Sequence, residues 1–168
     1  MLVDVSGSMQ SFTKPYLHLT RSLAMTGHAE VFAFGTELTR ITPSLRRRSP
    51  TEAIDRASEE VTDRFGGTRL AYSIRSLLTH KVWGSYVRGS IVLIASDGWD
   101  TDPPEEVAMQ MSKLARRCHK VIWLNPRSAN VEFEPLVASM AAALPHCTEF
   151  LPGHSLRAMS DVVEAICT

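Results

Sequence analysis

The chain has 168 residues, with 18 Lys and Arg against 18 Asp and Glu, and 44% of its residues are hydrophobic. This length and composition predict one folded domain with its own core, and they exclude a disordered or collagen-like chain. The formal net charge of +0 also argues against a nucleic-acid binder or a polybasic membrane binder.

Apolar runs and cysteines indicate the compartment. No apolar run approaches the roughly 20 residues that a membrane span needs, and Asp4 interrupts the apolar start where a signal peptide would continue. The cysteines Cys118, Cys147 and Cys167 are odd in number and widely spaced, which indicates reduced thiols rather than a disulfide framework or a zinc site. We therefore expect a cytoplasmic protein without a membrane span.

Short β-rich runs alternate with amphipathic helical stretches along the whole chain. This order is typical of a parallel sheet that is covered by helices on both faces. The predicted parallel strands are 1–5, 29–34, 91–96, 120–124 and 147–151. The fold class that follows is α/β, with three layers and a doubly wound, mostly parallel sheet.

One predicted strand must run the other way. Leu38 follows Phe34 too closely for a parallel crossover, so residues 38–42 are expected to form a short antiparallel edge strand. Pro43 and the arginines 46–48 would then protect this edge from pairing with another chain. A partner-binding patch is the alternative interpretation of the three arginines.

The predicted helices show apolar spacing and capping residues. Apolar residues recur at helical spacing in 70–78 and 133–144. Ser49 before Pro50 predicts the start of one helix, and Asp102 predicts the cap of another helix that begins after it.

The first predicted strand runs into a loop that is rich in oxygen-bearing side chains. Asp4, Ser6 and Ser8 alternate there, and Gly7 permits a sharp turn. If the chain is still extended, the three side chains point the same way, which suits a small hard cation. The alternative is a strand-to-helix turn whose side chains cap the next helix.

Two further segments favour the cation. Asp97 follows the most apolar strand, and Thr68 follows two glycines, Gly66 and Gly67. In a doubly wound sheet, ligands bind outside the carboxyl ends of the strands, where the strand order reverses. We therefore expect five side chains to converge on one crevice: Asp4, Ser6, Ser8, Thr68 and Asp97.

This set of five resembles the metal-ion-dependent adhesion site (MIDAS) of von Willebrand factor A (vWA) domains. That site combines an Asp-x-Ser-x-Ser loop, a Thr in a second loop and an Asp in a third. Within the vWA family, the chain resembles the carbon-monoxide dehydrogenase accessory, or CoxE-like, branch. The segments that carry this narrower resemblance are 4–9, 31–36, 66–69, 96–100, 121–126 and 151–155.

The resemblance implies a single vWA domain over residues 1–168, with the same doubly wound fold. Family members commonly carry a further region before this domain. Since only three residues precede Asp4, we expect that region to be absent.

The resemblance also implies a function without catalysis. The five residues would hold Mg²⁺, with Mn²⁺ or Ca²⁺ as alternatives, and an Asp or Glu of a protein partner would complete the coordination. CoxE-like proteins resemble partners of MoxR-type AAA+ ATPases, which implies an adaptor in the maturation or remodelling of a metalloenzyme client. The residues expected on the partner-binding rim are Gly7, Met9, Gly67, Trp99 and Asp100. For Trp99, a lid folded over the end of the sheet is the alternative.

Enzymatic alternatives find less support in the residues. Asp4 suits a Mg²⁺-dependent phosphoryl-transfer hydrolase, but haloacid-dehalogenase-like enzymes carry a second acid where Ser6 stands here. Ser8 lacks the Gly-x-Ser-x-Gly setting of an acyl-transfer nucleophile. The chain also has no Gly-x-x-x-x-Gly-Lys-Ser/Thr loop for nucleotide hydrolysis. We therefore expect no enzyme.

Overall fold

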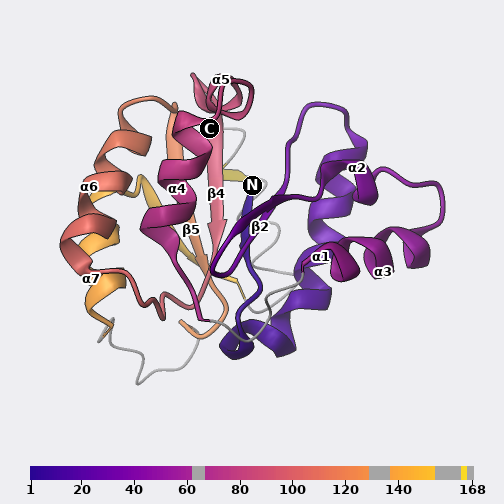
Figure 1. The fold of residues 1–168 in the computed structure, drawn as a ribbon, viewed down its shortest axis with the longest axis horizontal. Coiled ribbons are helices and arrows are strands. Elements are labelled where there is room, and N and C mark those ends of the chain that lie inside the picture. Colours follow the sequence, from indigo (N-terminus) through magenta and orange to yellow (C-terminus); the bar gives the residue numbers. More distant parts are fainter. Residues whose placement is uncertain (62–66, 129–136, 154–163, 166–168) are drawn as a thin grey trace.

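A computed structural model describes residues 1–61, 67–128, 137–153 and 164–165, and its centre is a six-stranded sheet (Figure 1). The strand order is β3-β2-β1-β4-β5-β6, and every pair is parallel except β2 with β3. The strands are β1 (Leu2–Asp4), β2 (Phe32–Phe34), β3 (Leu38–Arg40), β4 (Ile91–Ala95), β5 (Lys120–Asn125) and β6 (Glu149–Pro152). The predicted α/β class and the antiparallel edge strand are confirmed.

Helices cover both faces of this sheet (Figure 1). One face carries α1 (Gln10–Met25), α2 (Thr42–Leu45) and α3 (Pro50–Glu60), and the other carries α4 (Leu70–Thr79), α6 (Pro104–Ala115) and α7 (Ala138–Ala143). The short helix α5 (Trp83–Val87) lies near the amino end of β4, and 3₁₀ turns span Gly7–Met9 and Leu144–His146. In the described part of the chain, no helix combines the length and the apolar character that crossing a membrane requires.

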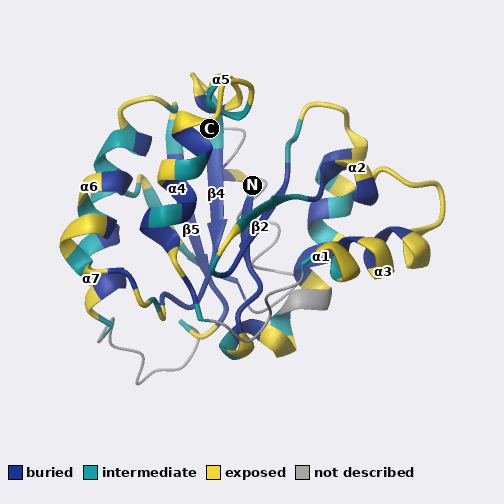
Figure 2. Cartoon of the chain, in the orientation of Figure 1, coloured by how far each residue is buried: buried dark blue, intermediate teal, exposed yellow. Residues whose placement is uncertain are grey.

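The strands alternate their side chains between two cores. Leu2 packs with the helices α4, α6 and α7, whereas its neighbour Val3 packs with α1 and α3. The central strands β4 and β5 are therefore buried along almost their whole length (Figure 2). The largest fully buried side chain is Trp123 of β5, whose indole N–H donates to the carbonyl oxygen of Ser96 at 2.9 Å.

The two predicted helix caps have different outcomes. Ser49 caps α3 as predicted, because its hydroxyl accepts the backbone N–H of Glu52 at 3.3 Å. The prediction that Asp102 caps the helix after it is wrong, since Pro103 is the N-cap residue of α6 and no side-chain cap is present among the described residues. Asp102 instead accepts the backbone N–H of Tyr72 at 2.9 Å, where the first turn of α4 leaves N–H groups unpaired.

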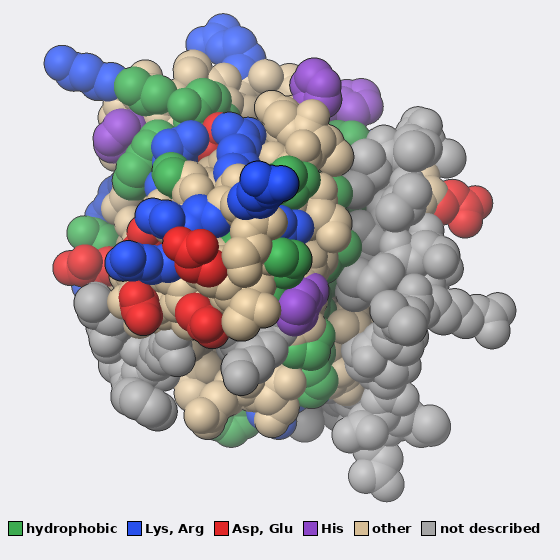
Figure 3. All heavy atoms as spheres, turned by 90° about the vertical axis from the view of Figure 1, so that its right-hand side faces the viewer, with side chains coloured by type: hydrophobic (Ala, Val, Ile, Leu, Met, Phe, Trp, Pro, Cys, Tyr) green, Lys and Arg blue, Asp and Glu red, His purple; other side chains and the backbone are tan. Residues whose placement is uncertain are grey.

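The arginines after α2 link elements of one face. Arg46 donates to the carbonyl oxygen of Ala24 at the end of α1, and Arg47 pairs with Glu52 of α3 at 2.9 Å. Figure 3 shows Lys and Arg side chains of this face next to Asp and Glu side chains. Pro43 lies in helix α2, and these arginines follow it. They therefore stand one element beyond the edge strand that they were predicted to protect.

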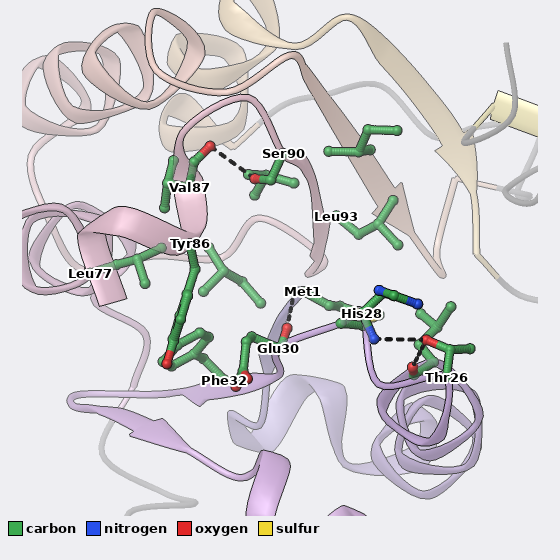
Figure 4. A pocket seen from close by; sticks show the side chains of 15 residues that line it. Met1, Thr26, His28, Glu30, Phe32, Leu77, Tyr86, Val87, Ser90 and Leu93 are labelled. Carbon is green, nitrogen blue, oxygen red and sulfur yellow. Dashed lines mark hydrogen bonds between the residues drawn. The ribbon is translucent and has the colours of Figure 1, made fainter. Parts of the chain in front are cut away.

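A cavity of about 460 Å³ opens at the amino ends of β1, β2 and β4 (Figure 4). Leu77 and Tyr86 lie on one side of it, and Thr26 and His28 lie on the other. It is at the opposite end of the sheet from Asp4 and Asp97, which follow the carboxyl ends of β1 and β4. The cavity is therefore separate from the predicted metal site.

The cysteines that the structure describes, Cys118 and Cys147, are free and partly buried. Burial raises the pKa of the Cys147 thiol to about 12, and it also raises the pKa of Cys118. Neither forms a disulfide within the described residues, in agreement with the prediction, and the raised pKa values disfavour the reactive thiolate. Cys167 lies outside the described residues.

We expect Trp123→Phe to lower the free energy of unfolding by about 1–3 kcal/mol, because it leaves a gap in the core and a buried carbonyl without its donor. The matched control is Trp99→Phe. Trp99 is 64% exposed, so its loss should change stability by no more than about 0.5 kcal/mol. Urea unfolding followed by circular dichroism measures both. Equal stability of the two variants would contradict the structural role of Trp123.

Candidate metal centre

Asp4 is the central residue of the predicted site. It ends β1 and is fully buried, at 0% exposure. Its Oδ1 accepts the backbone N–H of Ser6 at 2.9 Å, and its Oδ2 accepts the hydroxyl of Ser96 at 2.6 Å. The hydroxyl of Thr68 is a more distant donor, 3.4 Å from Oδ1. The Asp4 side chain is thus held by groups from three segments.

Two hydroxyls of the first loop lie side by side. Ser6 Oγ and Ser8 Oγ are 3.1 Å apart. Adjacent ligands of an octahedral ion at about 2.1 Å are themselves roughly 3 Å apart, so this spacing suits Mg²⁺. Neither the 3₁₀ turn that follows Ser6 nor helix α1 has a side-chain cap. The alternative interpretation, in which these side chains cap the next helix, is therefore wrong.

Thr68 is held in place by the loop that follows β4. Thr101 donates to the carbonyl oxygen of Thr68 through its backbone N–H at 2.9 Å and through its hydroxyl at 2.8 Å. Gly67, with a φ of 88°, makes the turn before Thr68, and a side chain there would press on Thr101. Gly66 lies outside the described residues.

Asp97 approaches from the end of β4 and is 1% exposed. Its Oδ1 accepts the backbone N–H of Trp99 at 3.2 Å. Its Oδ2 has no hydrogen-bond partner among the described residues, although it forms an ion pair with Arg127 Nε at 3.1 Å. The residue between Asp97 and Trp99 must be glycine, because Gly98 has a φ of 84° and a side chain there would collide with Met140.

Burial shapes the electrostatics of this cluster. It raises the pKa of Asp4 to about 6, and the nearby Asp97 carboxylate adds to the shift, while hydrogen bonds from Ser96 and Ser6 oppose it. An acid whose ionised form is disfavoured in this way gains from a nearby cation. The surroundings of Asp4 therefore favour a cation bound beside its carboxylate.

The donor set fits a hard divalent cation. Asp4, Ser6, Ser8 and Thr68 are linked by the contacts above, and the Asp97 charge acts on Asp4 at close range. All the candidate ligand atoms are oxygens, and the buried Asp97 Oδ2 accepts no hydrogen bond from any described residue. No three His, Cys, Asp or Glu side chains of the described chain form a metal cluster. The centre thus depends on hydroxyls as well as on its two carboxylates.

The residues predicted for the rim divide into two groups. Gly7 and Trp99 are exposed and Gly67 is partly exposed, so they can face a partner, and Trp99 is not a lid. Met9 is 0% exposed and packs in the core, because the 3₁₀ turn at Gly7–Met9 rotates its side chain inward. Met9 is therefore not a rim residue.

Asp100 has a different role from the one predicted. Its carboxylate accepts the backbone N–H groups of Leu70 at 2.7 Å and Asp102 at 2.6 Å, so it holds the start of α4. Burial raises its pKa to about 6, and the charges of Asp102 and Asp4 add to the shift. Asp100 therefore supports the site from behind and does not present a free carboxylate at the rim.

Three residues of the site were not predicted. Ser96 binds Asp4, Asn125 donates to the backbone carbonyl of Asp97 at 3.3 Å, and Arg127 pairs with Asp97. Ser96 directly precedes Asp97, and Asn125 ends the strand beside β4. Ser96 and Asn125 lie at the carboxyl ends of neighbouring strands, and this position could have identified them as residues of the site. Nothing in the sequence pattern distinguishes Arg127 from other surface arginines.

Solved structures with the same fold have low sequence identity to the chain. Proximal thread matrix protein 1 from the mussel byssus has a TM-score of 0.63 and 14% identity, over 98% of this chain and 44% of that one. A structure of that protein with a zinc-occupied MIDAS motif has a TM-score of 0.62 and 15% identity, over 98% and 45%. The conserved hypothetical protein BatB from Bacteroides thetaiotaomicron has a TM-score of 0.62 and 14% identity, over 99% and 95%. The chain thus spans less than half of the byssus protein.

No curated protein sequence matches the chain. Its residues 1–159 match a family model described as VWA domain containing CoxE-like protein. That match covers all five predicted metal ligands and all six strands. The chain belongs to the CoxE-like family of vWA domains.

Proposed function

We propose that the chain is a non-enzymatic interaction module in which Asp4, Ser6, Ser8, Thr68 and Asp97 hold Mg²⁺ and a partner's carboxylate completes the site. The observation that carries this proposal is the gathering of these oxygen-bearing side chains around two buried carboxylates, one of which has an oxygen without a hydrogen bond from the described residues. vWA domains are commonly protein-interaction modules, and membership of that family supports the proposal.

The protein's own groups prepare the site for a divalent cation. The Ser6 N–H and the Ser96 hydroxyl fix the Asp4 side chain before any ligand arrives. Asp4 and Asp97 together balance a divalent ion, and the three hydroxyls add no charge. When bound, Mg²⁺ would supply a positive charge and an open coordination position for a carboxylate oxygen. Mn²⁺ or Ca²⁺ could take the same place.

The partner that we propose is a MoxR-type AAA+ ATPase, with the chain acting as its adaptor in the maturation or remodelling of a metalloenzyme. The support for this is the CoxE-like family membership. The chain lacks a phosphate-binding Gly-x-x-x-x-Gly-Lys-Ser/Thr loop, so the energy would come from the ATPase. The exposed Trp99 beside Asp97 offers an aromatic anchor next to the metal.

The first test is metal binding, measured by calorimetric titration with MgCl₂. Asp4→Asn and Asp97→Asn should each weaken binding by at least about 100-fold, because even groups around a metal ligand commonly contribute about 10- to 100-fold. Asp55→Asn, which removes an exposed acid of α3, is the matched control and should bind like the unmodified chain.

The same variants test the partner. A purified MoxR-type ATPase should be retained by the immobilised chain with Mg²⁺, and it should be released by EDTA or by either site substitution. Retention that is indifferent to EDTA and to both substitutions would contradict the metal bridge.

The absence of catalysis is tested with p-nitrophenyl phosphate and Mg²⁺. We expect no turnover above the rate without protein, because Ser6 stands where a phosphoryl-transfer enzyme of the haloacid-dehalogenase type needs a second acid. Turnover that disappears in Asp4→Asn would instead establish a hydrolase that uses Asp4.

Stability should depend on pH and metal together. The pKa of Asp4 is about 6 in the fold against its ordinary value of 3.8, so the folded state keeps a proton that the unfolded state has lost. In EDTA, the contribution of Asp4 to the free energy of unfolding should therefore fall by about 2–3 kcal/mol as pH rises from 4 to 7. Mg²⁺ favours the ionised acid, so its stabilising effect should be larger at pH 7 than at pH 5.

Urea unfolding at pH 4, 5 and 7, with Mg²⁺ and with EDTA, measures this effect. Groups distant from Asp4 that titrate in this range do so alike in Asp4→Asn, so the difference between the two proteins reports Asp4 together with its charge coupling to Asp100. A difference that does not change between pH 4 and pH 7 would contradict the raised pKa.

A further inference from the structure

Arg127 lies across the proposed metal centre and contacts two of its five residues. Its Nη2 donates to the backbone carbonyl oxygen of Ser8 at 2.8 Å, and its Nε is 3.1 Å from Asp97 Oδ2. The Arg127 side chain is 47% exposed, whereas that of Asp97 is 0% exposed. The guanidinium therefore covers a buried carboxylate from the solvent side.

The placement of Arg127 is built into the chain on both sides. Its backbone N–H donates to the Asn125 side-chain oxygen at 2.7 Å, and the Asn125 amide donates to the Asp97 carbonyl oxygen at 3.3 Å. Asn125 thus connects the backbone of Arg127 with the backbone of Asp97. The backbone that carries the arginine is therefore fixed beside the site.

The ion pair between Arg127 and Asp97 is one in which another cation can replace the arginine. The two groups are paired by charge, but the Asp97 Oδ2 has no hydrogen bond within the part of the chain that the structure describes, so the arginine attracts this oxygen without fully satisfying it. Guanidinium keeps its charge at any ordinary pH. A divalent cation on the same oxygen would lie within a few ångströms of that charge and would be repelled by it.

We propose that Arg127 competes with the metal ion for Asp97, so that it lowers the affinity for Mg²⁺ and leaves the carboxylate when the metal binds. This inference rests on the proposed function and adds regulation to it: the chain carries its own displaceable cation. The exposed half of the side chain leaves room for the guanidinium to swing outward. Metal loading would then bring a second positive group to the rim, where a partner's carboxylate binds.

Competition predicts tighter metal binding when the arginine is removed. In calorimetric titration of the full chain with MgCl₂, Arg127→Gln should lower Kd by about tenfold, in line with a partly exposed ion pair next to a buried acid. Arg127→Lys keeps the charge but cannot reach both Ser8 and Asp97. Its Kd should therefore lie between that of the unmodified chain and that of Arg127→Gln. Arg88→Gln removes the same charge after α5, at the other end of the sheet, and should change Kd by less than about twofold.

A direct readout comes from the arginine itself. In ¹⁵N–¹H spectra, the Arg127 Nε–H signal is assigned by its loss in Arg127→Gln. Mg²⁺ should shift this signal in the unmodified chain, and Asp97→Asn should shift it in a similar way without metal. A signal that Mg²⁺ leaves in place would overturn the proposal.

The possible results separate the two proposals. If the unmodified chain binds Mg²⁺ and Arg127→Gln binds it equally or more weakly, the competition is refuted and the metal site stands. If no variant binds Mg²⁺, both are refuted. Should Arg127→Gln fail to fold by circular dichroism, Arg127→Lys decides: tighter binding supports competition, and equal or weaker binding refutes it.

Discussion

The burial of the Asp4 carboxylate is the constraint on which the rest of the site depends. A buried acid is costly unless donors surround it, and here the donors come from separate segments of the chain. The Ser96 donor is available only because β1 and β4 pair in one register, in which Val3 lies beside Ala95. A shift of that register by one residue would turn Asp4 away from Ser96 and take from its Oδ2 the hydroxyl donor that it has here. The sheet and the site therefore specify each other.

Beyond the sheet, the loop after β4 fastens the start of α4 to the centre. Asp100 and Asp102 accept N–H groups of the first turn of α4, where the helix dipole favours negative charge. Thr101, between them, holds the carbonyl oxygen of Thr68. Two acids near the proposed metal site thus serve the helix, and of the four acids described here Asp4 and Asp97 remain for a cation. A count of acids around the site would overestimate its negative charge.

Features that depend on local spacing were predictable from the sequence, and features that depend on distant contacts were not. The alternating elements and the antiparallel hairpin follow from short-range patterns, and Asp4 and Asp97 could be placed together because both follow strands at one edge of the sheet. Asp102 was assigned to the helix after it because sequence patterns relate near neighbours, but its partner Tyr72 lies 30 residues earlier. Met9 turned inward through a 3₁₀ turn that no pattern announced. Whether the five ligands bind a metal stays a prediction.

The segment Asp97–Asp100 has one further consequence. Trp99 donates its backbone N–H to Asp97, and Asp100 is anchored to α4, so the main chain at Trp99 is held from both sides while its side chain is 64% exposed. Backbone and side chain are therefore under separate constraints at this position. Replacing the indole by another side chain would alter the outline that a partner meets without loosening any bond of the site. Position 99 is thus a place where the surface beside the site can change at little structural cost.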